Sequence, residues 1–179
     1  MVAVGLTTTV AAGAAGAVVD AKKAKPAAWA TSVCTAANTW VGTVESSSTS
    51  ASSSAATAPK AAKKKLQSIV AKSIAATKKL IAKVKKAGTP DVPGGSDIIK
   101  IVLDEYKQVQ RTFVAAQKQL KTAPTTDATA LSGVARATED ALESGLEHVE
   151  QAMRLATNVD AGPLVDAFAS EPACANVTA

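Results

Sequence analysis

Residues 98–120, IIKIVLDEYKQVQRTFVAAQKQL, decide the fold class of this chain. Within the stretch, mostly large apolar side chains recur at steps that alternate between four and three residues. They are Val102, Tyr106, Val109, Phe113, Ala116 and Leu120. Residues three and four apart lie on one face of an α-helix, and the alternation of the two steps is the seam along which helices pack lengthwise. The stretch therefore predicts an amphipathic helix of a helical bundle.

Three further stretches carry the same helical spacing. Two expected helices cover residues 27–45 and 60–87, and another begins at Thr126 or Asp127. The buried face of the first of these helices is expected at Trp29, Val33, Trp40 and Val44. That of the second is expected at Leu66, Ile69, Val70, Ile74, Leu80, Ile81 and Val84. That of the last is expected at Leu131, Val134, Thr138, Leu142, Gly145, Leu146, Val149 and Met153. Aromatic residues make up only 3% of the chain, whereas alanine, the strongest helix former, is abundant. We predict an all-α fold, an antiparallel up-down four-helix bundle with a short C-terminal helix over residues 164–169.

The connections between these helices are marked by Ser, Gly and Pro. Residues 46–59, SSSTSASSSAATAP, favour a solvated linker, because serine side chains compete for backbone hydrogen bonds. Gly88 and the TPDVPGG that follows predict a turn, after which Ser96 or Asp97 can cap the next helix. Residues 27–179 are thus expected to form one bundle domain with a Ser-rich linker at 46–59.

The first 26 residues have a different character. Residues 1–21 are apolar and small and include short-side-chain sites suited to signal cleavage, although no Lys or Arg precedes the apolar run. Residues 1–26 are therefore either an export signal or a disordered N-terminal segment. No later stretch approaches the roughly 18 consecutive apolar residues that predict a transmembrane helix.

Cys34 and Cys174 are the two cysteines and lie near opposite ends of the expected domain. In an up-down bundle, the start of the first helix and the end of the fourth lie at the same end, and the short last helix could bring the cysteines together. Cysteine pairs of exported proteins are usually joined. We expect a disulfide and a secreted or cell-envelope location; two free thiols are the alternative in a reducing cytoplasm.

Catalytic and metal-binding motifs are not recognisable in the sequence. His148 is the one histidine, and Gly145 stands where a Glu-x-x-His pair would need its glutamate. We therefore expect an exposed histidine on the solvated acidic face of Glu143, Glu147 and Glu150. The chain also has no Gly-x-Ser-x-Gly elbow and no Gly-rich phosphate loop. These features predict a non-catalytic protein that uses no metal, cofactor or small-molecule substrate.

Charge is the most distinctive feature of the sequence. Residues 60–86 contain ten lysines and no acidic residue, whereas residues 127–171 contain nine acidic residues and two arginines. The basic helix could neighbour the acidic helix, face water, or offer a cationic stripe to nucleic acid, a wall polymer or lipid headgroups. Scarce arginine and the lack of interleaved aromatic residues disfavour specific nucleic-acid recognition. The candidate anion-binding residues are Lys63, Lys64, Lys72, Lys78, Lys79, Lys83 and Lys86.

Three short stretches carry a family resemblance: AAWATSVCTAANTWVGTV at 27–44, AGTPDVPGGSD at 87–97 and LVDAFASEPACANV at 164–177. With them the chain resembles a family of uncharacterised small secreted proteins and lipoproteins of actinobacteria. The resemblance implies an exported helical bundle with one disulfide and carries over no activity or functional residue. Trp40-Val41-Gly42 also matches the turn tripeptide of the Trp-x-Gly family of secreted helical hairpins, but two further helices and the cysteines depart from that pattern.

The expected function follows from compartment, charge and the lack of catalytic motifs. We predict a non-catalytic exported or cell-envelope bundle of structural or interaction type, whose partner is a protein or an envelope component. Binding of an anionic polymer through the Lys-rich second helix is the alternative prediction.

Overall fold

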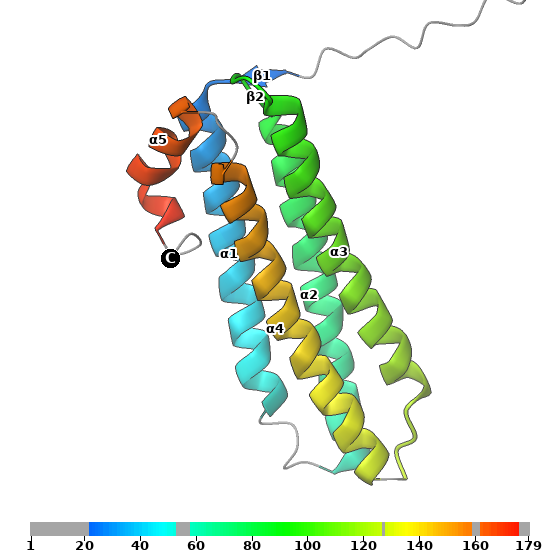
Figure 1. Ribbon diagram of the computed structural model, residues 1–179. Helices are drawn as coiled ribbons and strands as arrows, with labels where there is room; N and C mark the ends of the chain where they lie inside the picture. The colour runs from blue at the N-terminus through cyan, green and yellow to red at the C-terminus, as the bar shows by residue number, and fades with distance from the viewer. Residues whose placement is uncertain (1–21, 53–57, 127, 159–161, 176–179) are drawn as a thin grey trace, which may run out of the picture.

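Four long antiparallel helices build the molecule, as a computed structural model shows for residues 22–52, 58–126, 128–158 and 162–175 (Figure 1). They are α1 (Pro26–Ser52), α2 (Pro59–Ala87), α3 (Gly95–Thr122) and α4 (Ala128–Asn158). α2 packs between α1 and α3, and α4 closes the bundle against α3 and α1. The predicted all-α, up-down four-helix bundle is confirmed.

Two short C-terminal elements fold back along the outer side of α1 (Figure 1). They are α5 (Gly162–Ser170) and the 3-10 turn η1 (Pro172–Cys174). α5 begins two residues before the predicted start, because Pro163 fits the first turn of a helix, where its missing N–H costs nothing. We call residues 162–175 the C-terminal latch.

The sequence did not predict a two-residue parallel ladder at one end of the bundle. β1 (Lys23–Ala24) pairs with β2 (Thr89–Pro90) in the turn between α2 and α3. The Thr89 N–H donates to the Lys22 carbonyl at 3.2 Å, and the Asp91 N–H donates to the Ala24 carbonyl at 2.8 Å. Residues 22–24, which the sequence predicts to belong to the N-terminal segment, therefore pack on the α2–α3 turn (Figure 1).

Gly88 is the point at which the N-terminal residues meet this turn. Its φ of 80° lies in the region that favours glycine, and a Cβ there would lie 2.2 Å from the Lys22 carbonyl oxygen. The Gly88 carbonyl in turn accepts a hydrogen bond of 2.8 Å from the Trp29 indole. Close backbone approach and a positive φ therefore both require glycine at this position.

Gly88→Ala is expected to lower the free energy of unfolding by about 1–3 kcal/mol, because alanine is strained at this φ and collides with Lys22. Gly42→Ala is the matched control, since Gly42 is exposed within α1 and its added Cβ meets nothing within 4 Å. We expect the free energy of unfolding of that control to rise by up to about 1 kcal/mol, because alanine has the better helix propensity. Chemical denaturation measures both, and equal effects of the two substitutions would contradict the assigned role of Gly88.

The predicted helical faces form the core. Every position predicted for the first three helices is buried, and so are those of α4 except Val134 and Leu146, which are half-buried against the core. The two tryptophans are among the largest fully buried side chains. Trp40 packs against Phe113 with ring centroids 6.4 Å apart, and its indole donates to the Thr77 hydroxyl at 2.9 Å. The heptad spacing therefore identified the core correctly.

The linker predicted at 46–59 is wrong over its first seven residues, because α1 continues to Ser52. Ser47 and Ala51 continue the buried face of α1 at helical spacing from Val44, so packing holds this segment in a helix. The Ser47 hydroxyl also donates to the Thr43 carbonyl one turn earlier at 2.7 Å. Residues 53–57 lie outside the described part of the chain. Gly42 consequently lies inside a helix and not at a turn.

The start of α3 also differs from the prediction. Neither Ser96 nor Asp97 caps the helix; Gly94, with φ 69°, precedes its first turn and no side chain caps it. The carbonyl of Gly94 accepts from the N–H groups of Asp97 and Ile98 at 2.9 and 3.0 Å.

Within the described ranges, no helix combines the length and apolar character needed to cross a membrane.

Candidate functional site

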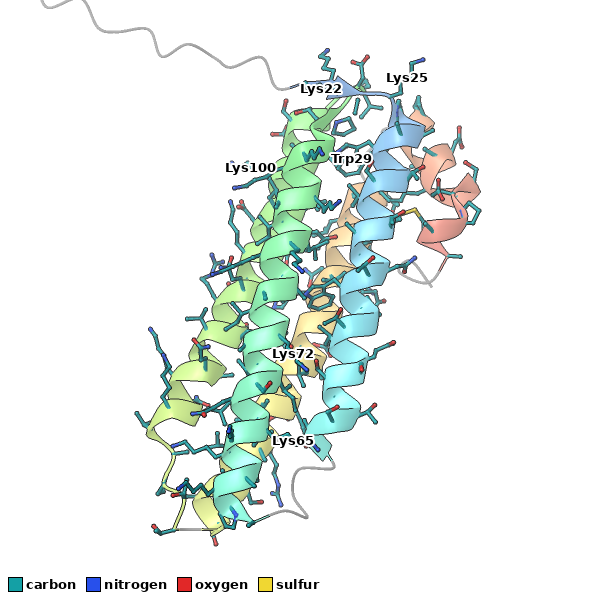
Figure 2. The ribbon with its side chains drawn as sticks, turned by 180° about the vertical axis from the view of Figure 1, so that it is seen from behind. Lys22, Lys25, Trp29, Lys65, Lys72 and Lys100 are labelled. Carbon is teal, nitrogen blue, oxygen red and sulfur yellow. A yellow bond between two sulfur atoms is a disulfide. The ribbon has the colours of Figure 1, made fainter. Side chains whose placement is uncertain are left out.

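A groove between α1 and α2 is the candidate site. It has a volume of about 930 Å³ and is lined by residues of these two helices. Lysines from α2 form one wall, and hydroxyl side chains from α1 form the other. The lining lysines are Lys72, Lys79, Lys83 and Lys86, and the lining hydroxyls are those of Thr31, Ser32, Thr35, Thr39 and Thr43. Figure 2 shows the bundle from the side on which α1 and α2 lie in front, with Lys72 labelled on α2.

The floor of this α1–α2 groove is apolar. Trp40 and Leu80 contribute from the two helices and are 1% and 2% exposed. The remaining apolar lining residues are Ala36, Ala75, Ala76 and Ala87. Alanines at these positions leave space between the two helices, so the longer lysines and threonines stand at the rim.

Helical spacing aligns the four lysines. They follow one another at steps of seven, four and three residues, which returns each side chain to the same face of α2. At a rise of about 1.5 Å per residue, the row from Lys72 to Lys86 is roughly 21 Å long. All four side chains are exposed. The wall is therefore an extended row of positive charge and suits a ligand with several anionic groups.

The hydroxyls of α1 are arranged in a matching row. Thr31, Thr35, Thr39 and Thr43 follow one another at steps of four residues. The Thr39 and Thr43 hydroxyls donate to backbone carbonyls one turn earlier, at 2.8 and 2.9 Å. The Ser32 hydroxyl donates in the same way at 2.8 Å. In this arrangement the proton of each of these three hydroxyls points to the backbone, and the oxygen lone pairs are left to act as acceptors.

A second hollow of about 480 Å³ continues the groove toward the end of α1. It shares Thr39, Thr43 and Lys72 with the first hollow. Its further lining residues are Asn38, Gly42, Ser46, Ser47, Ser50 and Ile69. The polar path between the two helices is therefore longer than the lysine row alone.

The structure brings together four of the seven predicted anion-binding lysines. Lys63 instead donates to the carbonyls of Lys121 and Ala123, at 3.0 and 2.5 Å, and so binds the C-terminal end of α3. Lys64 and Lys78 are exposed but do not line the groove. α4 lies diagonally across the bundle from α2, because α2 packs between α1 and α3. The basic and acidic helices are therefore not packed side by side.

Comparison with known proteins found no matching family model, no matching curated protein and no matching solved structure.

The C-terminal latch fastens to α1 through the predicted disulfide, which is confirmed. Cys34 and Cys174 are joined with their Cα atoms 4.9 Å apart, and both side chains are buried. Phe168 of α5 meets Trp29 edge to face, with ring centroids 6.0 Å apart. The Asn38 amide also donates to the Ala173 carbonyl. A covalent bond, an aromatic contact and a hydrogen bond thus hold the latch against α1.

Glu171 adds a pH-dependent contact to the latch. Its carboxylate accepts from the Thr31 hydroxyl, and it also accepts from the Ala173 N–H at 3.1 Å. These two hydrogen bonds, chiefly the first, lower the pKa of Glu171 below its ordinary value of 4.5. A carboxyl group with a lowered folded-state pKa stabilises the fold above its unfolded pKa, and this contribution disappears as the pH falls through the folded-state pKa.

We therefore expect the hydrogen-exchange protection factor of the Ala173 amide to decrease as the pH falls from 5 to 3. In Glu171→Gln, protection should be weaker at pH 7 and nearly constant over the same range, because the glutamine carries no titrating proton. The measurement is amide exchange followed by NMR and corrected for the intrinsic exchange rate. An equal decrease in both proteins would show that other groups control the latch.

His148 contradicts the sequence prediction of an exposed histidine. Its Nδ1 lies 2.8 Å from the Glu105 carboxylate of α3, and the two side chains are only 28% and 23% exposed. Glu105 is 43 residues away in sequence, so helical spacing on α4 alone could not identify it. In the described part of the chain, no three His, Cys, Asp or Glu side chains group together in a way that could hold a metal ion.

A cationic hollow of about 500 Å³ on α3 was not predicted from the sequence. Its lining includes Lys107, Arg111 and Lys118, whose steps of four and seven residues could have revealed it. Lys107 pairs with Asp104 at 2.8 Å, and this hydrogen bond lowers the pKa of Asp104. Arg111 donates to the Gln108 side chain at 2.9 and 2.6 Å. Since neighbouring side chains occupy two of its cations, the α1–α2 groove is the better anion site.

Proposed function

We propose that this protein is an exported, non-catalytic binding module that holds an anionic polymer along α2. The observation that carries the proposal is the row of Lys72, Lys79, Lys83 and Lys86 on one wall of the α1–α2 groove. A row roughly 21 Å long exceeds the size of a single small anion, so a polymer uses all four charges. Several weak ionic contacts along one chain can together give useful affinity.

Two further observations support the type of protein and its compartment. The lining residues of the groove include no His, Cys, Asp or Glu, which are the side chains that most often transfer protons or bind metals in enzymes. The buried Cys34–Cys174 disulfide favours an oxidising environment, which supports export to the cell envelope or the medium. On the part of the chain that the structure describes, no comparable surface feature favours the structural or protein-binding roles expected from the sequence.

The salt dependence of binding tests this proposal. Isothermal titration calorimetry with polygalacturonate, linear polyphosphate and oligothymidylate would measure affinity between 50 and 200 mM salt. If four lysines contact the polymer, affinity should fall roughly 50-fold over this range, taking the slope of about −0.7 per contact known for single-stranded nucleic acids. Binding that does not depend on salt, or no binding of any of the three polymers at 20 mM salt, would refute the proposal.

A further inference from the structure

We infer that the ligand of the α1–α2 groove is an extended acidic polysaccharide, a polymer that brings hydroxyl donors as well as negative charges. This inference rests on the proposed function, since it names the class of anionic polymer that the groove binds. The two walls offer complementary groups: ammonium donors on α2 and oxygen acceptors on α1. A ligand that uses the whole groove must therefore offer negative charges to α2 and hydrogen-bond donors to α1.

The hydroxyl oxygens of the α1 wall favour, among polymers of equal charge, those that carry hydrogen-bond donors. Because Ser32, Thr39 and Thr43 donate their protons to the backbone, each presents lone pairs to the groove, and donating to a ligand would require giving up the bond to the backbone. Phosphate and carboxylate groups are acceptors at neutral pH, so they gain less from this wall, because each hydroxyl would first have to leave its backbone carbonyl. Sugar hydroxyls can donate to it. An acidic polysaccharide therefore places its charged groups toward the lysines and its hydroxyls toward the threonines.

Single-stranded nucleic acid fits the groove less well. Proteins that bind single-stranded nucleic acid without sequence specificity gain much of their affinity by stacking bases on exposed aromatic rings. Trp40 is the aromatic residue that lines the groove, and it is 1% exposed with its indole bound to Thr77. No arginine lines the groove either, so planar stacking on a guanidinium is not available there.

A membrane surface fits less well than a polymer strand. Peripheral helices that bind lipid present large apolar side chains beside their cations. Among the described residues, Val165 on α5 is the large hydrophobic side chain that is exposed, and it does not line the groove. The lysines border a recess between two helices, which admits a single chain more readily than a flat bilayer.

The test compares three anions of similar charge by calorimetry at 20 mM salt. Hexagalacturonate carries carboxylates and hydroxyls, a linear hexaphosphate carries charge without hydroxyls, and heptathymidylate carries phosphates and bases. We expect hexagalacturonate to bind at least tenfold more tightly than the other two. Thr39→Val with Thr43→Val removes two acceptors and keeps the β-branched shape. This pair should weaken hexagalacturonate binding roughly 30-fold and leave hexaphosphate binding unchanged within twofold.

Thr49→Val with Thr122→Val is the matched control, because both residues are exposed and lie outside the groove lining. It should leave all affinities unchanged, and circular dichroism should show all variants folded. Equal or tighter binding of hexaphosphate or heptathymidylate, or unchanged hexagalacturonate affinity in Thr39→Val/Thr43→Val, would overturn the polysaccharide inference while anion binding stands. If none of the three anions binds, the proposed function itself fails, and this inference fails with it.

Discussion

Replacing Cys34 and Cys174 with alanine is expected to lower the free energy of unfolding by about 5 kcal/mol. The disulfide joins residues 140 positions apart, so it restricts almost the entire described chain in the unfolded state. The chain-entropy model gives about 5 kcal/mol for a loop of this length. Both cysteines are fully buried, and alanine avoids the unsatisfied hydroxyl that serine would leave in the core.

Urea denaturation of the double variant and of the reduced wild-type protein distinguishes the stability lost with the cross-link from the stability lost with the cysteine side chains. If loop closure is the main contribution, the two proteins should lose similar amounts of stability. A loss below about 1 kcal/mol in both would show that the latch is held by its non-covalent contacts. Those contacts are the Trp29–Phe168 packing and the hydrogen bonds to Asn38 and Thr31.

Trp40→Ala is expected to lower the free energy of unfolding by about 3–5 kcal/mol, the typical range for removing a large aromatic side chain from a core. Trp40 is 1% exposed, packs on Phe113 and donates to Thr77. Gly145 of α4 provides space for it, because a Cβ at that position would lie 3.4 Å from the Trp40 ring. Removal therefore leaves a cavity where α1, α3 and α4 meet.

Two controls accompany this substitution in the same denaturation experiment. Trp40→Phe retains most of the packing and loses the indole hydrogen bond, so its cost should be about 1–2 kcal/mol. Val165→Ala changes the exposed apolar residue of α5 and should stay within about 0.5 kcal/mol of the wild type. A cost for Trp40→Ala below that of Trp40→Phe would contradict the assigned role of this ring.

Helix faces could be predicted from the sequence because periodic burial is a local property. Val102 through Leu120 repeat at heptad spacing, and each of these predicted positions is buried. The helix end at Ser52 could not be predicted in this way. Serine disfavours helices on average, but Ser47 and Ala51 are held by packing that depends on the neighbouring helices.

The groove could be predicted only in part, because it depends on which helices are neighbours. The run of lysines indicated α2, but the sequence did not indicate that α1 would supply the second wall. The four-residue spacing of Thr31, Thr35, Thr39 and Thr43 was a signal that could have identified that wall. Long-range pairs such as Lys63 with Lys121 and His148 with Glu105 have no local signal at all.

The most direct test of anion binding in the groove compares two charge-matched variants of α2. One replaces Lys72, Lys79, Lys83 and Lys86 with glutamine, and the other replaces Lys60, Lys64, Lys78 and Lys85. Each removes four exposed lysines and lowers the formal net charge from +5 to +1. Non-specific attraction should therefore weaken equally in both variants.

The measurement is the calorimetric affinity of both variants for polygalacturonate at 20 mM salt. We expect the groove variant to lose roughly 50-fold in affinity, which corresponds to four exposed ionic contacts of about 0.6 kcal/mol each. The second variant should stay within about threefold of the wild type. Equal losses in the two variants would contradict a binding site in the α1–α2 groove.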